Sequence, residues 1–385
     1  MKIYYEDSMP YAAEFFAELG DCQVFSHKTL NADMLVDADV LLVRSTTKVN
    51  QQLLEKNKHV QFVGTATAGT DHIDKGFLAS QNIPFTSAGG CNAVAVAEYV
   101  LSAMVVMGQR FNWDLAGKTL GIVGAGHVGS ALARLLTVLG IQYKLCDPPL
   151  EHAGDSRTFV SMHEIMSCDV ISLHVPWVKD GPYATQHLFD KTRLKALTSD
   201  QLLINACRGE VIDNQAALEL FAQGQPLNLV LDVWENEPSI NLNLIPHIAL
   251  ATAHIAGHTI EGKARGTEML YFALCRHLGI PANKKLSDYL PQAAPSTIQI
   301  QNKQGFWPLV QALVLDVYNI EIDDQHFRAN MPHAGMQSVE TQTAEQFRYI
   351  RKHYPIRREF SAITLNTGNF ADSKAIYDLG FLPLD

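Results

Sequence analysis

The chain has 385 residues, of which 47% are hydrophobic and 18% charged, and its formal net charge is −10. This length predicts two or three domains, and the composition is that of a soluble globular protein. The negative net charge argues against a general affinity for nucleic acid or an anionic membrane, although a few arginines could still bind an anionic substrate.

The six cysteines are scattered along the chain and form no CxxC pair. This pattern predicts reduced thiols rather than a disulfide framework. The first ten residues, MKIYYEDSMP, lack the apolar core of a signal peptide, and no apolar run is long enough to span a bilayer. We therefore expect a soluble, cytoplasmic protein with neither a membrane nor a nucleic acid as partner.

Short β-branched segments alternate with helical patterns over the first 280 residues. The expected strands are 2–5, 38–43, 61–67, 83–87, 119–124, 143–147, 169–175, 201–207, 228–234 and 247–253. Helical patterns are clearest at 94–109, 127–140 and 261–279. Several strands are apolar at consecutive positions, which is typical of parallel strands covered on both faces. The alternation predicts a doubly wound α/β architecture.

The order of these elements predicts two similar α/β lobes of the Rossmann or flavodoxin-like kind. Residues 1–97 would form a substrate-binding lid lobe, completed by the returning segment 256–285, and residues 98–255 a nucleotide-binding domain. A polar, proline-containing linker at 288–305 then leads into a C-terminal α+β domain, residues 286–385.

A glycine-rich turn follows the strand expected at 119–124. It reads Gly124-Ala-Gly126-His127-Val128-Gly129 and opens an apolar helix. In such a turn the first glycine allows the tight bend, the second admits a pyrophosphate, and the third lets the helix pack on the strand. The N–H groups at the start of the helix then stabilise the phosphates.

Asp147 ends the next expected strand, where a carboxylate accepts hydrogen bonds from the adenine ribose of a dinucleotide. It would repel a 2′-phosphate, so the pattern favours NAD over NADP. The alternative, a plain glycine turn with a surface aspartate, does not explain why strand, glycines, helix and acid occur in register.

Three consecutive strand ends carry groups suited to hydride transfer with proton exchange. Arg208 follows one strand, Asp232 and Glu237 the next, and His254 the third. A carboxylate beside a histidine orients the ring as a general acid/base, and an arginine grips a carboxylate in bidentate fashion. Each residue also has an ordinary interpretation: a surface charge, a turn cap or a packing histidine.

His254 and His258 are four residues apart, which in a helix would suggest a metal pair. Gly257 lies between them, and no Cys/His/Asp ligand set lies nearby in the sequence. We therefore expect no metal. His254 would be the proton-transfer residue and His258 a separate contact.

With these residues in place, the chain resembles the D-isomer-specific 2-hydroxyacid dehydrogenase family. The resemblance spans about 280 residues. It rests on the glycine loop, the Arg–Glu–His order and the segments LLVRSTTKVN (41–50), GTATAGTDHID (64–74), GCNAVAVAEYV (90–100), LCDPP (145–149), KDGPYATQHL (179–188), INACRG (204–209) and HIAGHTIEGKARGT (254–267). The family implies an NAD-dependent enzyme acting on a 2-hydroxy acid.

The resemblance also assigns residues to roles. It implies that Arg208, Glu237 and His254 are catalytic, with His254 the proton donor in the reducing direction. The positions implied to contact NAD are Gly124, Gly126, His127, Val128, Gly129, Asp147, Val175, Asp232 and Gly257; Ser45 and Thr67 match substrate contacts. His258 stands where the most similar members have a substrate-contacting tyrosine. A C-terminal domain of this length is implied to form a homodimer.

Those most similar members act on a phosphorylated 2-hydroxy acid, whose phosphate needs its own cations. Arg44 is the first candidate. The second is the basic run 348–358, with Arg348, Arg351, Lys352, Arg357 and Arg358, one of which could reach the phosphate across a dimer interface. The alternative is that this run is a solvated basic face.

Two other functions compete with this interpretation. A sibling enzyme, such as a phosphoglycerate dehydrogenase, would share the catalytic trio and the NAD loop but not the 64–74 and 179–188 segments. The C-terminal region also lacks an obvious regulatory βαββαβ pattern. An NAD-responsive scaffold of the same fold is the second alternative, although the intact trio favours an enzyme and no basic tail is present.

Overall fold

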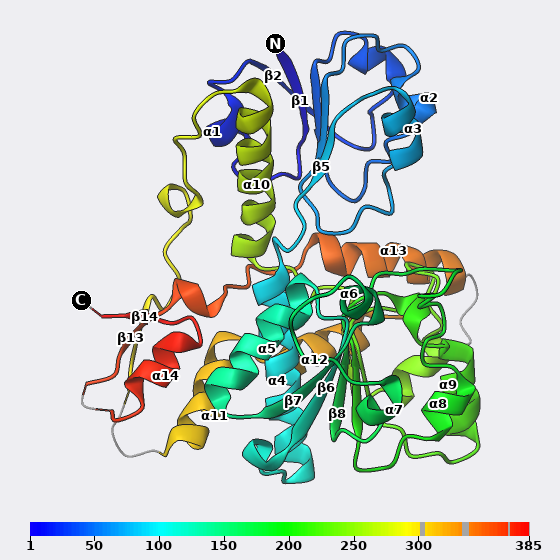
Figure 1. Cartoon of the computed structure of the whole chain (residues 1–385), viewed down its shortest axis with the longest axis vertical. Helices are drawn as coiled ribbons and strands as arrows, with labels where there is room; N and C mark the ends of the chain where they lie inside the picture. Colours follow the sequence, from blue (N-terminus) through cyan, green and yellow to red (C-terminus); the bar gives the residue numbers. More distant parts are fainter. Residues whose placement is uncertain (301–304, 333–338, 369, 385) are drawn as a thin grey trace. The chain divides into compact units, whose positions relative to one another are not determined.

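The computed structural model describes residues 1–300, 305–332, 339–368 and 370–384 (Figure 1). The chain divides into two compact units. Unit 1 comprises Met1–Asn92 and Thr259–Gln292, and unit 2 comprises Ala93–His258 and Ala293–Asp385. The chain therefore leaves unit 1, builds most of unit 2, returns to unit 1 and finishes in unit 2.

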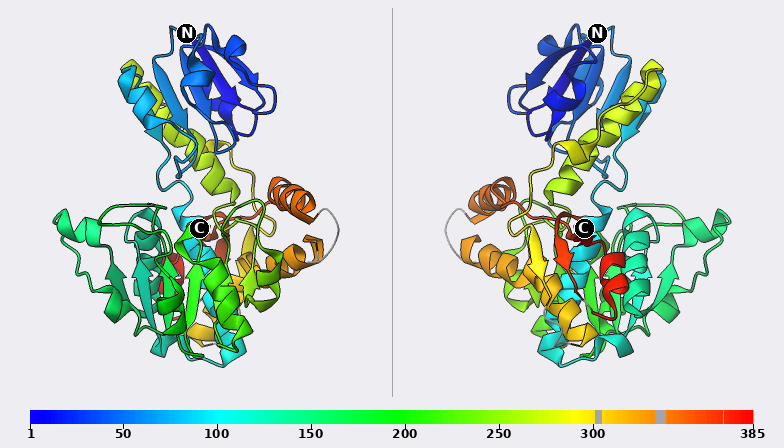
Figure 2. Two further views of the ribbon diagram at one scale, coloured as in Figure 1. Left: turned by 90° about the vertical axis from the view of Figure 1, so that its right-hand side faces the viewer. Right: turned by 90° about the vertical axis from the view of Figure 1, so that its left-hand side faces the viewer.

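Unit 1 is a parallel sheet in the order β2-β1-β3-β4-β5, which is the flavodoxin-like order. Its elements are β1 (Lys2–Glu6), α1 (Ala12–Phe16), β2 (Asp21–Phe25), η1 (Ala32–Leu35), β3 (Val40–Val43), α2 (Gln51–Leu54), β4 (Phe62–Thr65), α3 (Lys75–Ser80), β5 (Phe85–Ser87), α10 (Ile260–Leu278) and η5 (Leu286–Asp288). The residues of β3 and β4 are all buried, as expected for central parallel strands. Figure 2 shows α10 lying along this sheet.

Two glycines allow α10 to pack closely on unit 1. A Cβ atom at Gly64 of β4 would lie 3.0 Å from the Leu270 side chain, and one at Gly266 would lie 2.4 Å from the carbonyl oxygen of Ala66. Any side chain at Gly266 would push the helix off the strand end. The returning segment is therefore part of the core of unit 1, although it comes about 170 residues after Asn92.

Unit 2 contains the second doubly wound sheet and the C-terminal segment. Its elements up to residue 258 are α4 (Ala93–Phe111), η2 (Leu115–Gly117), β6 (Thr119–Val123), α5 (His127–Leu139), β7 (Gln142–Cys146), α6 (Pro148–His152), α7 (Met162–Ile165), β8 (Val170–Leu173), α8 (Lys191–Lys195), β9 (Leu202–Asn205), η3 (Gly209–Val211), α9 (Asn214–Ala222), β10 (Leu229–Leu231), η4 (Leu242–His247) and β11 (Leu250–Ala251). The sheet is parallel throughout, in the order β11-β10-β9-β8-β6-β7. The predicted α/β fold is therefore confirmed.

One strand of the nucleotide-binding half is reduced to a single bridge. Leu145 of β7 pairs with Phe159 in parallel, and Val160 donates its N–H to the Leu145 carbonyl. Counting this bridge as a strand gives the Rossmann order, with the reversal between β6 and β8. Ligands of such sheets bind at the carboxyl ends of the strands beside that reversal.

The expectation that no apolar run is long enough to span a bilayer is wrong at α4, which is long and apolar enough in composition to cross a membrane. However, 78% of its most apolar stretch is buried inside the structure. It packs with α5 and with residues of the C-terminal segment in one hydrophobic core. We therefore describe α4 as the core helix of unit 2.

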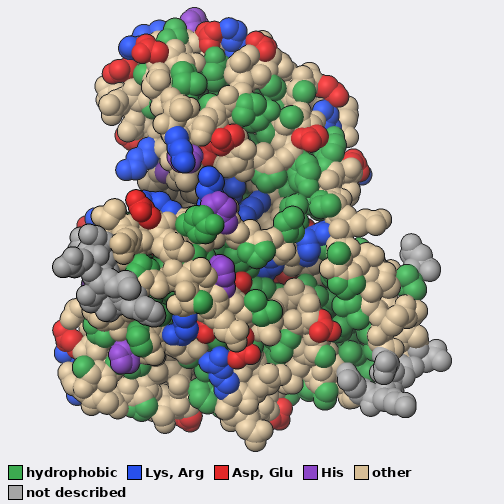
Figure 3. Space-filling view, turned by 180° about the vertical axis from the view of Figure 1, so that it is seen from behind, with side chains coloured by type: hydrophobic (Ala, Val, Ile, Leu, Met, Phe, Trp, Pro, Cys, Tyr) green, Lys and Arg blue, Asp and Glu red, His purple; other side chains and the backbone are tan. Residues whose placement is uncertain are grey.

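On the face seen in Figure 3, acidic and basic side chains are interspersed over the described residues.

The C-terminal segment packs into unit 2 as a small α+β layer. Its elements are β12 (Thr297–Gln299), α11 (Phe306–Val317), α12 (Ile320–Asn330), α13 (Val339–Lys352), η6 (Phe360–Ala362), β13 (Thr364–Asn366), α14 (Ser373–Asp378) and β14 (Leu382–Pro383), with the parallel sheet order β12-β13-β14. The linker expected at 288–305 is thus wrong in part, because β12 lies within it and pairs with β13. The predicted boundaries of three functional domains stay a prediction.

Candidate active site

The glycine loop after β6 has a backbone that only small residues allow. Gly124 has a φ of +93°, and a Cβ there would lie 2.5 Å from the carbonyl oxygen of His174. A Cβ at Gly129 would lie 2.1 Å from the Gly124 carbonyl oxygen, so the start of α5 sits directly on the turn. A Cβ at Gly126 would meet nothing within 4 Å.

The start of α5 fits the diphosphate of a dinucleotide. Gly126 and His127 are exposed and Val128 is half-buried, so the first turn of the helix is accessible from the surface. The helix has 13 residues, and its dipole and unpaired N–H groups favour an anion at this end. The open position at Gly126 supplies the room that a phosphate needs.

Asp147 lies at the end of β7, beside the glycine loop. Its Oδ2 accepts the N–H of Ala125 at 2.8 Å, and its Oδ1 accepts the N–H of Leu150 at 3.0 Å. An ionised carboxylate can accept about four hydrogen bonds, so each oxygen keeps capacity for a ribose hydroxyl. The aspartate therefore braces the loop and remains suited to binding a ribose.

Arg157 supports the other side of the same loop. Its Nη1 donates to the Ala125 carbonyl and to the Ser130 hydroxyl, both at 2.9 Å, while Nε and Nη2 pair with Asp155. No sequence motif indicates this role, because the arginine lies in a polar loop without a periodic pattern.

Val175 lies just beyond β8, next to the strand reversal. The Nε2 atom of the preceding His174 shares a hydrogen bond with the Ser172 hydroxyl, 2.9 Å away. Burial lowers the pKa of His174 to about 3, so its ring stays neutral. Val175 is half-buried at the carboxyl edge of the sheet, where a cofactor contact is expected.

Glu237 and His254 form a close pair at the ends of β10 and β11. Glu237 Oε2 lies 2.7 Å from His254 Nδ1, and Oε1 accepts the N–H of Trp234 at 2.9 Å. Burial by itself raises the pKa of Glu237, but the charge and hydrogen bond of His254 outweigh it and lower the pKa below its ordinary value. The carboxylate therefore stays ionised, and it engages Nδ1 of the His254 ring rather than Nε2.

The His254 backbone is held in an unusual conformation. Its φ is +56°, a left-handed value that costs energy in a residue other than glycine. The neighbouring Asp232 compensates: its carboxylate accepts the N–H groups of Ile255 and Ala256 at 2.7 and 2.9 Å, and its carbonyl accepts the His254 N–H at 2.6 Å. Asp232 thus shapes the loop that carries the histidine.

Arg208 follows β9 and precedes η3. One of its guanidinium nitrogens donates to the Cys207 carbonyl at 2.7 Å. The backbone is tightly packed here, since a Cβ at Gly209 would lie 2.0 Å from the carbonyl of Trp234. The ends of β9, β10 and β11 adjoin at one edge of the sheet, which brings the segments bearing Arg208, Glu237 and His254 to the same edge.

His258 is separated from His254 by a turn. Its N–H donates to the Ile255 carbonyl at 2.8 Å, and Gly257 lies within the turn. The His258 and Tyr354 rings are arranged edge-to-face, with their centroids 6.0 Å apart. The two histidines therefore share no helical face, and α10 begins only at Ile260.

The predicted substrate residues of unit 1 lie at the ends of β3 and β4. Ser45 is exposed, and the Thr67 hydroxyl bonds to the Thr65 hydroxyl at 2.8 Å and the Gly69 carbonyl at 2.9 Å. Arg44 is half-buried and donates through Nη1 to the Ser8 carbonyl at 3.0 Å. These residues belong to a different unit from His254, and each unit is described by itself.

Glu6 organises the loop that holds Arg44 and Ser45. Its buried carboxylate accepts the Arg44 N–H at 2.9 Å and the hydroxyls of Thr46 and Thr47, both at 2.7 Å. The Ser8 hydroxyl is a fourth donor, at 2.6 Å. These hydrogen bonds lower the pKa of Glu6 against the opposing effect of burial.

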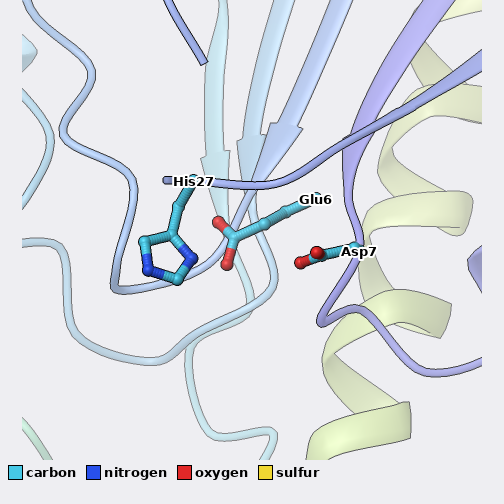
Figure 4. Close-up of side chains that lie close together, drawn as sticks. All are labelled: Glu6, Asp7 and His27. Carbon is cyan, nitrogen blue, oxygen red and sulfur yellow. The ribbon is translucent and has the colours of Figure 1, made fainter. Parts of the chain in front are cut away.

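Two groups of side chains have the spacing of metal ligands among the described residues. One is Glu6, Asp7 and His27 (Figure 4). Its central carboxylate already accepts four donors, which uses the capacity of an ionised carboxylate. The other contains His187, Asp213 and Glu235, where His187 Nε2 bonds to Glu235 at 2.6 Å. The Glu6 carboxylate and the His187–Glu235 pair are therefore engaged by internal hydrogen bonds.

The basic run 348–358 divides into surface and interior. Arg348 and Lys352 are exposed, Arg351 and Arg358 are half-buried, and Arg357 is buried at 5% exposure. Arg357 donates to two backbone carbonyls. It is thereby removed from the candidates for a phosphate contact, and the interpretation of the whole run as a solvated face is also wrong at this residue.

Known sequences match this chain along its full length. Residues 98–256 match the NAD-binding domain of D-isomer-specific 2-hydroxyacid dehydrogenases, and residues 289–380 match a domain of unknown function. An erythronate-4-phosphate dehydrogenase from Pseudoalteromonas atlantica is 60% identical over 381 residues, 99% of each chain. Another from Colwellia psychrerythraea is 46% identical over 402 residues, again 99% of each.

The chain belongs to the erythronate-4-phosphate dehydrogenase family. This membership confirms the resemblance seen in the sequence, and it makes the chain an NAD-dependent dehydrogenase by family. Solved structures agree on the fold of about three quarters of the chain. An NAD⁺-bound 3-phosphoglycerate dehydrogenase from Entamoeba histolytica superposes with a TM-score of 0.61 at 23% identity, covering 74% of this chain and 99% of its own. An NAD complex of formate dehydrogenase from Staphylococcus aureus gives 0.57 at 23% identity, covering 74% and 98%.

The structure shows supporting roles for three residues that the sequence did not predict, although Arg357 was named there as a possible phosphate contact. Arg157 supports the glycine loop, Glu6 supports the loop of Arg44 and Ser45, and Arg357 bonds to the loop of His254. Each acts through a backbone group far away in sequence. Only the hydrogen-bond geometry of the folded chain reveals such roles.

Proposed function

We propose that this protein catalyses the NAD-dependent oxidation of 4-phospho-D-erythronate to (R)-3-hydroxy-2-oxo-4-phosphooxybutanoate, a step of pyridoxine 5′-phosphate (vitamin B6) biosynthesis. The observation that carries the proposal is the Glu237–His254 pair at the carboxyl edge of an NAD-binding sheet, in a chain 60% identical to an erythronate-4-phosphate dehydrogenase.

The proton of the C2 hydroxyl goes to His254. Nδ1 is engaged by the Glu237 carboxylate at 2.7 Å, which leaves Nε2 as the nitrogen that takes the proton. The ionised carboxylate stabilises the imidazolium that forms and keeps the ring from rotating. In the reducing direction the same nitrogen returns the proton. Bound NAD supplies the hydride acceptor for the C2 hydrogen.

The substrate carries a negative charge at each end, and we assign a cation to each. Arg208 would hold the carboxylate beside C2 through its planar guanidinium, which also polarises the forming carbonyl. Ser45, Thr67 and the N–H groups around Gly69 would complete the contacts of unit 1. Arg44 is our candidate for the phosphate, and His258 would donate a hydrogen bond where relatives have a tyrosine.

NADH formation by the purified protein tests the proposal. We expect turnover of 4-phosphoerythronate and none, or far less, of 3-phosphoglycerate at equal concentrations. Comparable turnover of both would point to a phosphoglycerate dehydrogenase, and turnover of neither would refute both assignments. Repeating the assay with a 2-oxo acid acceptor shows whether bound NADH must be reoxidised in place.

The variant His254→Gln separates an enzyme from a scaffold. We expect the folded variant to lose activity and to fail to support pyridoxine-independent growth. Growth at the parental rate with the inactive variant would favour an NAD-responsive scaffold of the same fold.

We also propose that the protein is a cytoplasmic homodimer. The C-terminal segment exposes Ile322, Tyr349 and Ile356 at 65%, 55% and 75%, which is unusual for large apolar side chains of one segment. All six cysteines are thiols, as suits a reducing compartment. Sedimentation of the parent beside Ile356→Lys tests the dimer, because a lysine at this position should favour the monomer.

A further inference from the structure

The C-terminal segment, whose residues 289–380 match a domain of unknown function, contacts the strand and loops that carry the catalytic pair. Asp324 of α12 accepts the N–H of Ala251 in β11 at 2.7 Å. Phe327 of the same helix stacks on Trp234 at 5.6 Å, and Trp234 in turn donates to Glu237. Within unit 2, the segment therefore contacts β11, which precedes His254, and Trp234, which anchors Glu237.

Arg357 makes the most direct of these contacts. Its Nη1 donates to the Ala256 carbonyl at 3.0 Å, and its Nη2 donates to the Ala95 carbonyl of α4 at 2.8 Å. Ala256 is two residues from His254. The guanidinium thus ties the catalytic loop to the core helix, and only a planar fork with two donors can make both bonds at once.

A buried polar cluster keeps the guanidinium in place. Arg357 Cζ lies 3.6 Å from the centre of the Tyr318 ring. The hydroxyls of Tyr318 and Tyr354 both donate to Asp323 Oδ2, at 2.9 and 2.7 Å. The Tyr354 ring also packs edge-to-face with the His258 ring. All four cluster members belong to the C-terminal segment, and two of them touch the 254–258 loop.

The loop that carries His254 requires support because of its backbone conformation. His254 adopts a left-handed backbone conformation that persists only when its surroundings impose it. Asp232 holds the N–H groups of Ile255 and Ala256, and Arg357 holds the carbonyl of Ala256. The loop is therefore held through two N–H donors, which Asp232 binds, and through one carbonyl acceptor. The hydrogen bond to that carbonyl comes from the C-terminal segment.

We propose that Arg357 is a positioning residue for the dehydrogenation, and that the C-terminal domain of unknown function serves the active site of its own chain by fixing the His254 loop. The proposal rests on the function proposed above. It assigns Arg357 no contact with substrate or cofactor. Its effect reaches the reaction through the placement of His254 Nε2.

Single-turnover formation of NADH by the full-length protein tests the proposal. Lysine at position 357 can reach one carbonyl but not both, so Arg357→Lys should lower the single-turnover rate about tenfold or more, because small misplacements of a catalytic group are costly. The KM for 4-phosphoerythronate should change little. An unchanged rate in the folded variant would overturn the proposal.

Arg328→Lys is the matched control. Arg328 is another guanidinium of this segment that donates to two carbonyls, those of Ile245 and Ile248 at 2.7 and 2.6 Å, but these precede β11. We expect both variants to lose thermal stability and only Arg357→Lys to lose the fast single turnover. Equal losses of rate in both would mean general stabilisation and would overturn the proposal.

A second variant covers the case in which Arg357→Lys does not fold. Tyr318→Leu keeps the arginine and removes the ring beneath it. We expect a lower single-turnover rate and faster amide exchange at Ile255 and Ala256, and no change in either would overturn the proposal. Failure of the parent to oxidise 4-phosphoerythronate would instead refute the proposed function.

Discussion

Glu237 holds His254 by its Nδ1 at 2.7 Å, and the same carboxylate is anchored by the N–H of Trp234. A backbone hydrogen bond thus holds the Glu237 carboxylate in position, and this carboxylate orients the His254 ring. Glutamine at 237 would keep the shape and lose the charge that stabilises the imidazolium. We expect Glu237→Gln to lower kcat about 100-fold, within the range for general acid–base groups. Steady-state NADH formation measures this.

Glu235→Gln is the control for that prediction. Glu235 also pairs with a histidine, His187, at 2.6 Å, and lies two residues away. We expect its kcat to stay within about threefold of the parent, because Glu235 bonds to His187 and to the Asn214 N–H and not to His254. A loss as large as that of Glu237→Gln would mean that the whole segment is sensitive to charge, and the specific role of Glu237 would be rejected.

Two glycines of the nucleotide loop should respond differently to alanine. A Cβ at Gly126 meets nothing, so Gly126→Ala should fold normally and bind NAD about tenfold or more weakly, because the methyl group occupies the phosphate side. A Cβ at Gly129 lies 2.1 Å from a backbone oxygen, so Gly129→Ala should lower the melting temperature. Thermal unfolding and NAD titration distinguish the two, and normal NAD affinity in folded Gly126→Ala would contradict the assignment.

Asp147 should set the preference for NAD over NADP. Asp147→Asn removes the charge and keeps an acceptor oxygen for one of the backbone donors Ala125 and Leu150. We expect the ratio of kcat/KM for NAD over NADP to fall about tenfold, which corresponds to about 1.4 kcal/mol. Asp155→Asn, which changes a carboxylate that pairs with Arg157, is the control. An unchanged ratio in Asp147→Asn would refute the role.

Glu6 should make stability depend on acidic pH. Its pKa in the folded chain lies below the ordinary value of 4.5, so its stabilisation is complete above that value and is lost as pH falls through the folded pKa. Glu6→Gln should cost about 2 kcal/mol at pH 7 and show a weaker loss of stability on acidification. Urea unfolding at pH 7 and pH 4 measures both. An equal loss of unfolding free energy between pH 7 and pH 4 in the parent and in Glu6→Gln would contradict this role of Glu6.

Arg44 should affect binding of the phosphorylated substrate more than catalysis. We expect Arg44→Ala to raise the KM for 4-phosphoerythronate about tenfold with little change in kcat, as when uniform binding is lost. Lys48→Ala, an exposed cation of the same loop region, is the control. An unchanged KM would remove Arg44 from the phosphate site.

The sequence predicted the parts of this protein that local patterns specify. The glycine loop could be located because strand, turn and helix follow each other directly, and Gly124 and Gly129 each have a steric reason within the chain. The strand β2 was missed, because Asp21–Phe25 is mostly exposed and lacks the apolar run of its neighbours. Charge pattern also misled at Arg357, since a basic run says nothing about which of its members is buried.

The role of Asp232 and Asp147 in holding backbone N–H groups could not be predicted either. Both were expected to contact NAD, and both also accept backbone N–H groups within the unit. Such bonds depend on the distance between segments after folding. The family resemblance assigns a residue to a position and does not show what that residue holds together.

The late return of α10 has a consequence for synthesis of the chain. Leu270, Tyr271 and Leu274 of this helix share a core with Ile3 and Leu42 of the first strands. Until about residue 278 has left the ribosome, one face of an already translated sheet lacks its covering helix. During this interval the nascent chain exposes apolar strands that are prone to aggregate, so chaperone binding should concentrate on residues 1–92 while unit 2 is still being made.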